Sequence, residues 1–179
     1  MRYVFCLTVC TIVFLSCKSD TAGTSGSHGV FGRTTIDSTT GYGFSFARGT
    51  PQPVPPFPTY DSVDDFNAGY IETRWDPTPI ALCFRGYTEH MFHLVRQFST
   101  YDSARSFFQS LAEVTDTSFL GTTCQGSDLE PMTRANQIWS VVTRQNKFAK
   151  MLIVIDTNLS NHLQVTFDWE YQPTGSRRF

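Results

Sequence analysis

The feature that most constrains the fold is a run of three strand-like segments within residues 137–171. In the last of them apolar and polar residues alternate; the apolar ones are Leu163, Val165, Phe167, Trp169 and Tyr171. A period of two is typical of a β-strand with one buried and one solvated face. Polar residues 145–147 separate the first two segments, and Asn146 tolerates the left-handed backbone of a tight turn. The pattern therefore predicts a β-meander, and it identifies no chemistry.

Further strand-like segments precede the meander. We expect a short aromatic strand at 42–46, a hairpin formed by 68–75 and 80–85, and another strand at 92–98. Five prolines fall between residues 51 and 58, where they exclude a helix or a central strand. The upstream segments are therefore expected to extend the sheet.

One amphipathic helix is predicted at about 100–114. Its apolar residues recur at a spacing that places them on one face; they are Ala104, Phe107, Phe108 and Leu111. Ser99 or Thr100 can cap this helix, and Asp102 places negative charge in the first turn, where it is favoured. Residues 115–135 show no clear period, and we interpret them as a long loop.

Together these elements predict an α+β fold, in which an antiparallel β-sheet of five to seven strands carries the helix on one face. The alternative is a mainly-β sandwich with the helix as an insertion. A chain of 179 residues suits one domain. We assign this single globular domain to 42–173 and expect 174–179 to form a short tail.

The N-terminus is typical of an exported protein. Met1 and Arg2 precede an apolar run, 3–15, that is shorter than the roughly 20 residues of a membrane-spanning helix. A positive start followed by a short apolar run indicates a secretory signal peptide, which we place at 1–16.

Ser16 and Cys17 at the end of this run resemble the lipobox of bacterial lipoproteins. The resemblance implies that Cys17 is diacylated and becomes the first residue of the mature protein; the alternative is a plain signal peptide. Several acyl chains, at roughly 0.8 kcal/mol per buried methylene, would hold the protein on a lipid bilayer. We therefore expect an outer-membrane lipoprotein of the bacterial cell envelope, facing the periplasm or the cell surface. The Ser-, Thr- and Gly-rich residues 17–41 are interpreted as the anchor and a flexible tether.

The cysteines divide into two groups once the signal peptide is considered. Cys6 and Cys10 fall within it, and Cys17 is the expected anchor. Cys83 and Cys124 remain in the domain, where an oxidising compartment favours a disulfide between them. Two separate buried thiols are the alternative, and we expect no metal site.

No catalytic signature is present, so we expect a protein that is not an enzyme. A net charge of -2 gives no electrostatic footprint for nucleic acid. His90, Met91 and His93 are the candidate ligand residues, because histidine and methionine bind haem iron and copper. The simpler interpretation is one exposed loop histidine and one packed histidine.

Residues 139–150, from Trp139 to Lys150, resemble the strand–turn–strand segment of the HmuY-type haem-binding lipoproteins of Bacteroidetes. Residues 165–171 resemble the last strand of that family, and 43–49 resemble its early strand. The resemblance implies a related lipoprotein sheet and raises haem as a ligand, but it supplies no haem-ligand residue.

Three classes of function follow. The first is a non-catalytic interaction or structural protein of the cell envelope, with an unknown envelope protein as partner and no cofactor. The second is a ligand-binding lipoprotein for haem or another small hydrophobic molecule. The third is an envelope enzyme, for which the sequence identifies no catalytic residues.

Overall fold

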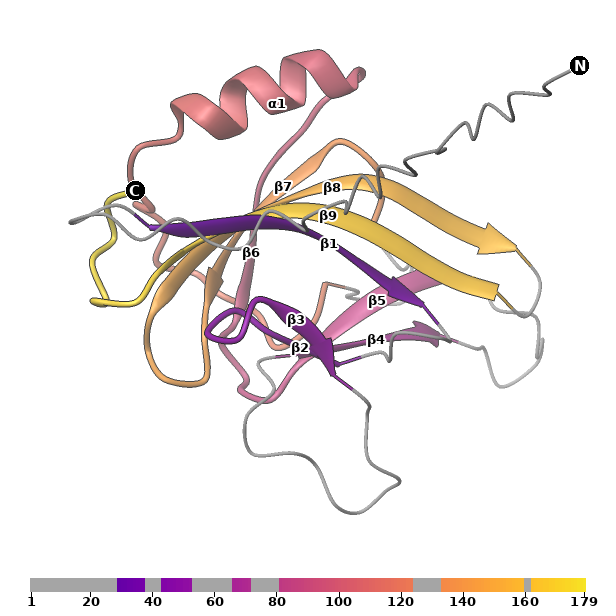
Figure 1. Cartoon of the computed structure of the whole chain (residues 1–179), viewed down its shortest axis with the longest axis horizontal. Helices are drawn as coiled ribbons and strands as arrows, with labels where there is room; N and C mark the ends of the chain where they lie inside the picture. The colour runs from indigo at the N-terminus through magenta and orange to yellow at the C-terminus, as the bar shows by residue number, and fades with distance from the viewer. Residues whose placement is uncertain (1–28, 38–42, 53–65, 72–80, 124–132, 160–161) are drawn as a thin grey trace, which may run out of the picture.

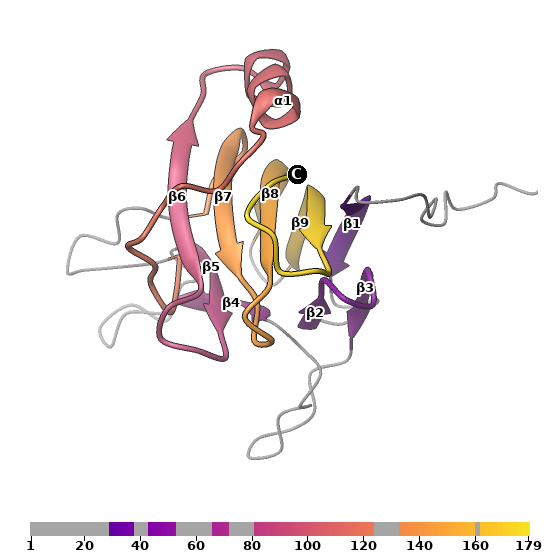
Figure 2. The ribbon, with the colours of Figure 1, turned by 90° about the vertical axis from the view of Figure 1, so that its left-hand side faces the viewer.

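The computed structural model describes residues 29–37, 43–52, 66–71, 81–123, 133–159 and 162–179. These residues form two antiparallel sheets that face each other, and one helix, α1 (Tyr101–Ser110), on the outer side of the larger sheet (Figure 1). Figure 2 shows the order of the five strands of the larger sheet: β1 (Val30–Asp37), β9 (His162–Gln172), β8 (Phe148–Leu159), β7 (Gln137–Val142) and β6 (Phe92–Gln97). The order of the smaller sheet is β3 (Thr50–Gln52), β2 (Gly43–Ser45), β4 (Phe66–Ile71) and β5 (Ala81–Gly86).

The predicted meander is confirmed as β7, β8 and β9, which pair in antiparallel succession. Asn146 has a φ of 56° in the first turn, as its residue type predicts. The other predicted strands are present as β2, the β4–β5 hairpin and β6, although residues 72–80 of the hairpin lie outside the described part of the chain. Of these, β6 extends the main sheet as expected, whereas β2, β4 and β5 belong to the second sheet, so the prediction of a single sheet is wrong. Pro51 lies in β3 at the edge of the smaller sheet, where proline is tolerated.

Aromatic side chains from both sheets fill the space between them. The rings of Phe44 and Phe167 meet edge to face with centroids 5.0 Å apart. The ring of Phe66 lies 4.8 Å from that of Phe84 and 5.7 Å from that of Phe92. The apolar face predicted for the last strand points into this core, where Val165, Phe167, Trp169 and Tyr171 are buried. Edge-to-face pairs add to the stabilisation from area burial, so the two sheets form one packed unit.

The prediction that residues 17–41 form a flexible tether is wrong for 30–37, which form β1 and pair with β9 along its length. A Cβ at Gly32 would come within 2.8 Å of the indole ring of Trp169. Thr34 Oγ1 accepts a hydrogen bond from Trp169 Nε1 at 3.0 Å. Because the indole requires small and polar neighbours on β1, this strand has a tether-like composition, and the folded domain begins earlier than predicted.

The predicted helix is confirmed in position but ends at Ser110 rather than near residue 114. Thr100 is the N-cap, and its Oγ1 accepts a hydrogen bond from Ser103 N–H at 3.4 Å. The buried residues of α1 pack on the larger sheet in a cluster of Ala104, Phe108, Ile138 and Leu152. The coarse α+β class is therefore confirmed: the fold is mainly antiparallel β-sheet with a five-stranded main sheet and a helix on its face.

The predicted tail, 174–179, is docked rather than free. Phe179 N–H donates to Ala112 O at 2.8 Å, and Val114 N–H donates to Arg177 O at 2.8 Å. These bonds attach the tail to the segment that follows α1. Within the described residues, no helix has the length and apolar character needed to cross a membrane.

Candidate functional site

A cleft of about 750 Å³ lies between α1 and the β1 side of the larger sheet. It exists because α1 packs on β7 and β8 and leaves the outer face of β9 and β1 uncovered. Its side chains come from three elements: Phe31 and Arg33 from β1, Arg105, Phe108 and Gln109 from α1, and Asp168 and Glu170 from β9. We refer to it as the α1–β1 cleft.

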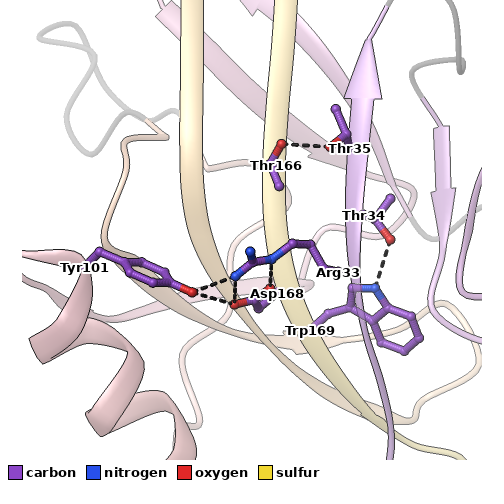
Figure 3. A network of polar contacts seen from close by, with 7 residues as sticks. All are labelled: Arg33, Thr34, Thr35, Tyr101, Thr166, Asp168 and Trp169. Atoms are coloured by element: carbon purple, nitrogen blue, oxygen red, sulfur yellow. Dashed lines mark hydrogen bonds and ion pairs between the residues drawn. The ribbon is translucent and has the colours of Figure 1, made fainter. Parts of the chain in front are cut away.

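A polar network closes the end of the cleft nearest the N-terminus of α1 (Figure 3). Arg33 and Asp168 form a bidentate pair, with Nε 2.5 Å from Oδ1 and Nη2 2.8 Å from Oδ2. Arg33 Nη2 also donates to Tyr101 Oη at 2.6 Å, and Tyr101 Oη donates to Asp168 Oδ2 at 3.2 Å. The hydrogen bond to Asp168 is the main cause that raises the pKa of Arg33 above its ordinary value. The two opposite charges of the pair balance each other.

A buried lysine joins the C-terminal end of α1 to the sheet. Lys150 on β8 is 2% exposed, and its Nζ donates to Phe108 O at 3.0 Å and to Leu111 O at 2.8 Å. The same ammonium lies 3.0 Å from Glu170 Oε2 and 4.8 Å from the ring centroid of Phe179. A cation is favoured beside the free carbonyls of a helix C-terminus, so Lys150 fixes the end of α1 to the sheet.

Two lining residues have no such role. Phe31 on β1 is 68% exposed, and the only other large hydrophobic residue exposed in the described part of the chain is Ile155 at 50%. Arg105 on α1 is exposed and forms no ion pair with any described residue. The described lining includes carboxylates, guanidinium groups, an amide and aromatic rings, which are groups suited to binding a molecule.

The predicted ligand residues do not face a common point. His90 is exposed, and its Nδ1 lies 3.1 Å from Phe119 O. Met91 is fully buried in the core between the sheets. His93 lies on β6, outside the α1–β1 cleft. No group of three or more His, Cys, Asp or Glu among the described residues is arranged to hold a metal ion.

His93 belongs to a polar cluster that the sequence did not indicate. Its Nε2 lies 3.1 Å from Asp116 Oδ1, and its Nδ1 lies 2.7 Å from Ser118 O. Ser140 Oγ donates to Asp116 Oδ2 at 2.6 Å. The carboxylate thus lies between the serine and the histidine, whereas an activated serine needs the histidine beside its hydroxyl. Ser140 is also fully buried, so this cluster attaches the loop around Asp116 to β6 and β7.

Cys83 is disulfide-bonded, which excludes a free thiol at this position. Cys124 lies outside the described residues, so its pairing with Cys83 stays a prediction. The neighbouring residues favour that pairing, because Thr123 N–H donates to Phe84 O at 3.0 Å and Phe84 N–H donates to Thr123 Oγ1 at 2.8 Å. The predicted signal peptide, 1–16, and the predicted anchor, Cys17, also lie outside the described residues and stay predictions.

The sequence reasoning missed Phe31 and Arg33 because both lie in the segment interpreted as tether. A local signal was present: Val30, Thr34, Thr35 and Ile36 give this stretch a high β-propensity. The Ser-, Thr- and Gly-rich residues around it concealed that signal.

No protein-family model, curated protein or solved structure matches this chain. The resemblance to HmuY-type lipoproteins therefore stays a prediction.

Proposed function

We propose that this protein is a lipid-anchored binding protein of the bacterial cell envelope that acts without catalysis, and that the α1–β1 cleft is its binding surface. The observation that carries the proposal is the exposure of Phe31 at the wall of the cleft. When a bound molecule covers a large aromatic side chain that is exposed to water, the burial of its apolar surface stabilises the complex.

The size and the fixed wall of the cleft also support a ligand-binding role over a purely structural one. Its volume falls within the range of about 300–1,000 Å³ that is usual for small-molecule sites. The helix α1 is fixed to the sheet by the Arg33–Asp168–Tyr101 network and by Lys150, so this wall of the cleft is held in place before anything binds. A preformed site loses little conformational entropy on binding.

Haem receives no support from the candidate residues. Met91 is in the core, and both ring nitrogens of His93 lie within hydrogen-bonding distance of oxygen atoms. Axial ligation by this set would require the β6 region to rearrange. We therefore assign the binding role to the cleft, where no histidine or methionine is among the described lining residues.

Photo-crosslinking in cells tests the binding surface. Benzoylphenylalanine at position 31 is expected to give a discrete adduct, detected by intact-mass spectrometry of the purified protein. Ile155 is the matched control, because it is an exposed apolar residue of the same sheet that does not line the cleft. Equal labelling at both positions, or none at position 31, would contradict the proposal.

The anchor has a separate test. Replacing Cys17 with Ala is expected to release the protein from the membrane fraction, because no acyl chain can then be attached. Cell fractionation with immunoblotting measures the release. A Cys17→Ala protein that stays with the membranes would refute lipid anchoring at this residue, whatever the cleft binds.

A further inference from the structure

We propose that the α1–β1 cleft binds a small amphipathic molecule with a single negative charge, whose acidic group is held by Arg105 and whose apolar body lies on Phe31. This inference rests on the proposed function, and it assigns a chemical class to the ligand.

The charges of the cleft lead to this class. Arg33 and Asp168 neutralise each other in their bidentate pair. Glu170 is neutralised by Lys150, which lies directly opposite it on the neighbouring strand. Arg105 makes no ion pair with a described residue, so the cleft carries one uncompensated positive charge. A monoanion balances this charge, whereas a neutral molecule would leave the guanidinium unpaired as the cleft is desolvated.

The position of Arg105 on α1 suits an acidic group inside the cleft. Tyr101, Arg105 and Gln109 follow one another at i, i+4 and i+8, so they share one side of the helix. The Tyr101 hydroxyl reaches Arg33 on β1, which shows that this side of the helix faces β9 and β1 (Figure 3). The Arg105 guanidinium and the Gln109 amide together offer several N–H donors to a carboxylate, sulfonate or phosphate ester.

The apolar body of the ligand is indicated by the opposite wall. Phe31 lies on β1 across from α1 and exposes 68% of its surface, while Phe108 contributes a 9% exposed ring from the helix. An aromatic or acyl group between these rings would remove apolar surface of both partners from water. A molecule with one acidic end and one apolar end can therefore pair with Arg105 on one wall and pack on Phe31 on the other.

The size of the cleft and its one bridged end favour a small molecule over an extended polypeptide. The volume of about 750 Å³ is within the usual range for small-molecule sites. The hydrogen bond from Arg33 to Tyr101 joins β1 to α1 across the outer face of β9, so a peptide strand could not continue past this link.

Two fluorescent probes that share one ring system test the proposal. 8-Anilinonaphthalene-1-sulfonate is a monoanion, and N-phenyl-1-naphthylamine is the same molecule without the sulfonate. Each is titrated into the purified full chain carrying Cys17→Ala, so that no acyl chain competes for the probe. We expect the sulfonate to bind about tenfold more tightly than the neutral probe, because its acidic group gains charge-assisted hydrogen bonds.

Three variants assign this selectivity to the cleft. Arg105→Gln is expected to remove the tenfold preference without weakening the binding of the neutral probe. Phe31→Ser is expected to weaken both probes severalfold. Arg144→Gln is the matched control, because Arg144 is exposed at the β7–β8 turn and does not line the cleft; it should leave both affinities unchanged.

The proposal is overturned if the two probes bind equally to the parent protein, or if Arg105→Gln keeps the preference. It is also overturned if the adduct at position 31 is a protein chain rather than a small molecule. In each of these cases labelling at position 31 but not at position 155 still supports the cleft as a binding surface, so the ligand class and the proposed function fail separately.

Discussion

The outer face of the larger sheet has two halves that differ in how they are covered. Over β7 and β8, Ala104 and Phe108 of α1 pack on Ile138 and Leu152 and exclude water. Over β9 and β1, Tyr101 of the same helix bonds to Arg33 and Asp168, and Phe31 is left exposed. One short helix therefore seals one half of the face and forms a wall of a cleft over the other half. We call these the sealed half and the open half.

The difference separates apolar packing from the proposed binding surface along one sheet. Apolar packing on the sealed half stabilises the domain, and the charged pairs that border the open half fix the helix without filling the space. Substitutions that affect the sealed half, or the lysine that borders both halves, should change stability most. Substitutions in the open half should change binding most.

The largest loss of stability is expected for Lys150→Met, which keeps the apolar stem and removes the ammonium. Phe108 O and Leu111 O would lose their donor, and Glu170 would lose its ion-pair partner. Each unsatisfied buried group costs about 1–3 kcal/mol, so we expect a loss of about 3–4 kcal/mol in the free energy of unfolding, measured by urea denaturation. Lys147→Met at the β7–β8 turn is the control and should change it by less than about 0.5 kcal/mol. An equal, small loss for both variants would show that Lys150 does not hold α1.

A slightly smaller loss is expected for Leu152→Ala in the sealed half. Leu152 is fully buried beneath α1, and its truncation leaves a cavity between helix and sheet. Leu→Ala substitutions at such sites cost about 2–5 kcal/mol, and we expect about 3 kcal/mol by the same urea denaturation. Ile155→Ala on the same strand is the control, because its side chain is 50% exposed. Similar losses for Leu152→Ala and Ile155→Ala would mean that the half is not sealed.

The sealed half could be predicted from the sequence, because its signals are local. The helical spacing of Ala104 and Phe108 identifies the residues of α1 that face apolar neighbours. The alternation in the last strand identifies, in the same way, the residues that face the core between the sheets. The left-handed turn at Asn146 is also a property of one residue type. Such patterns depend on positions a few residues apart, so they can be recognised in the sequence without knowledge of the tertiary structure.

The open half could not be predicted, because its features depend on contacts distant in sequence. Gly32 and Thr34 look like linker residues until the indole of Trp169 is placed against them. Lys150 looks like a solvated strand residue until the end of α1 is placed over it. Arg33 pairs with a residue on β9 that is 135 positions away. Only the tertiary pairing of β1 with β9 brings Arg33 and Asp168 to one cleft.

A smaller effect is expected for Arg33→Gln, which removes the pair with Asp168 at the border of the open half. The Arg33 side chain is 54% exposed, so solvent screening limits the loss to about 0.5–1 kcal/mol in urea denaturation. The difference between parent and variant should shrink in 1 M NaCl, because salt screens the pair. Arg178→Gln is the control, since the pair of Arg178 with Glu113 is longer, at 3.4 Å, and more exposed. A loss that does not depend on salt would assign the effect to packing against Tyr101.

The smallest effect on stability is expected for Phe31→Ser in the open half, although the same change should weaken binding. The ring is 68% exposed and packs on little of the domain, so the free energy of unfolding should change by less than about 0.5 kcal/mol. Urea denaturation of the purified protein measures this, with Leu152→Ala as the reference from the sealed half. A loss above about 1 kcal/mol would mean that Phe31 is packed in solution and that the cleft is closed in the free protein. An unchanged stability together with weakened probe binding would instead establish that the two halves have separate roles, because the exposed ring contributes free energy only when a ligand covers it.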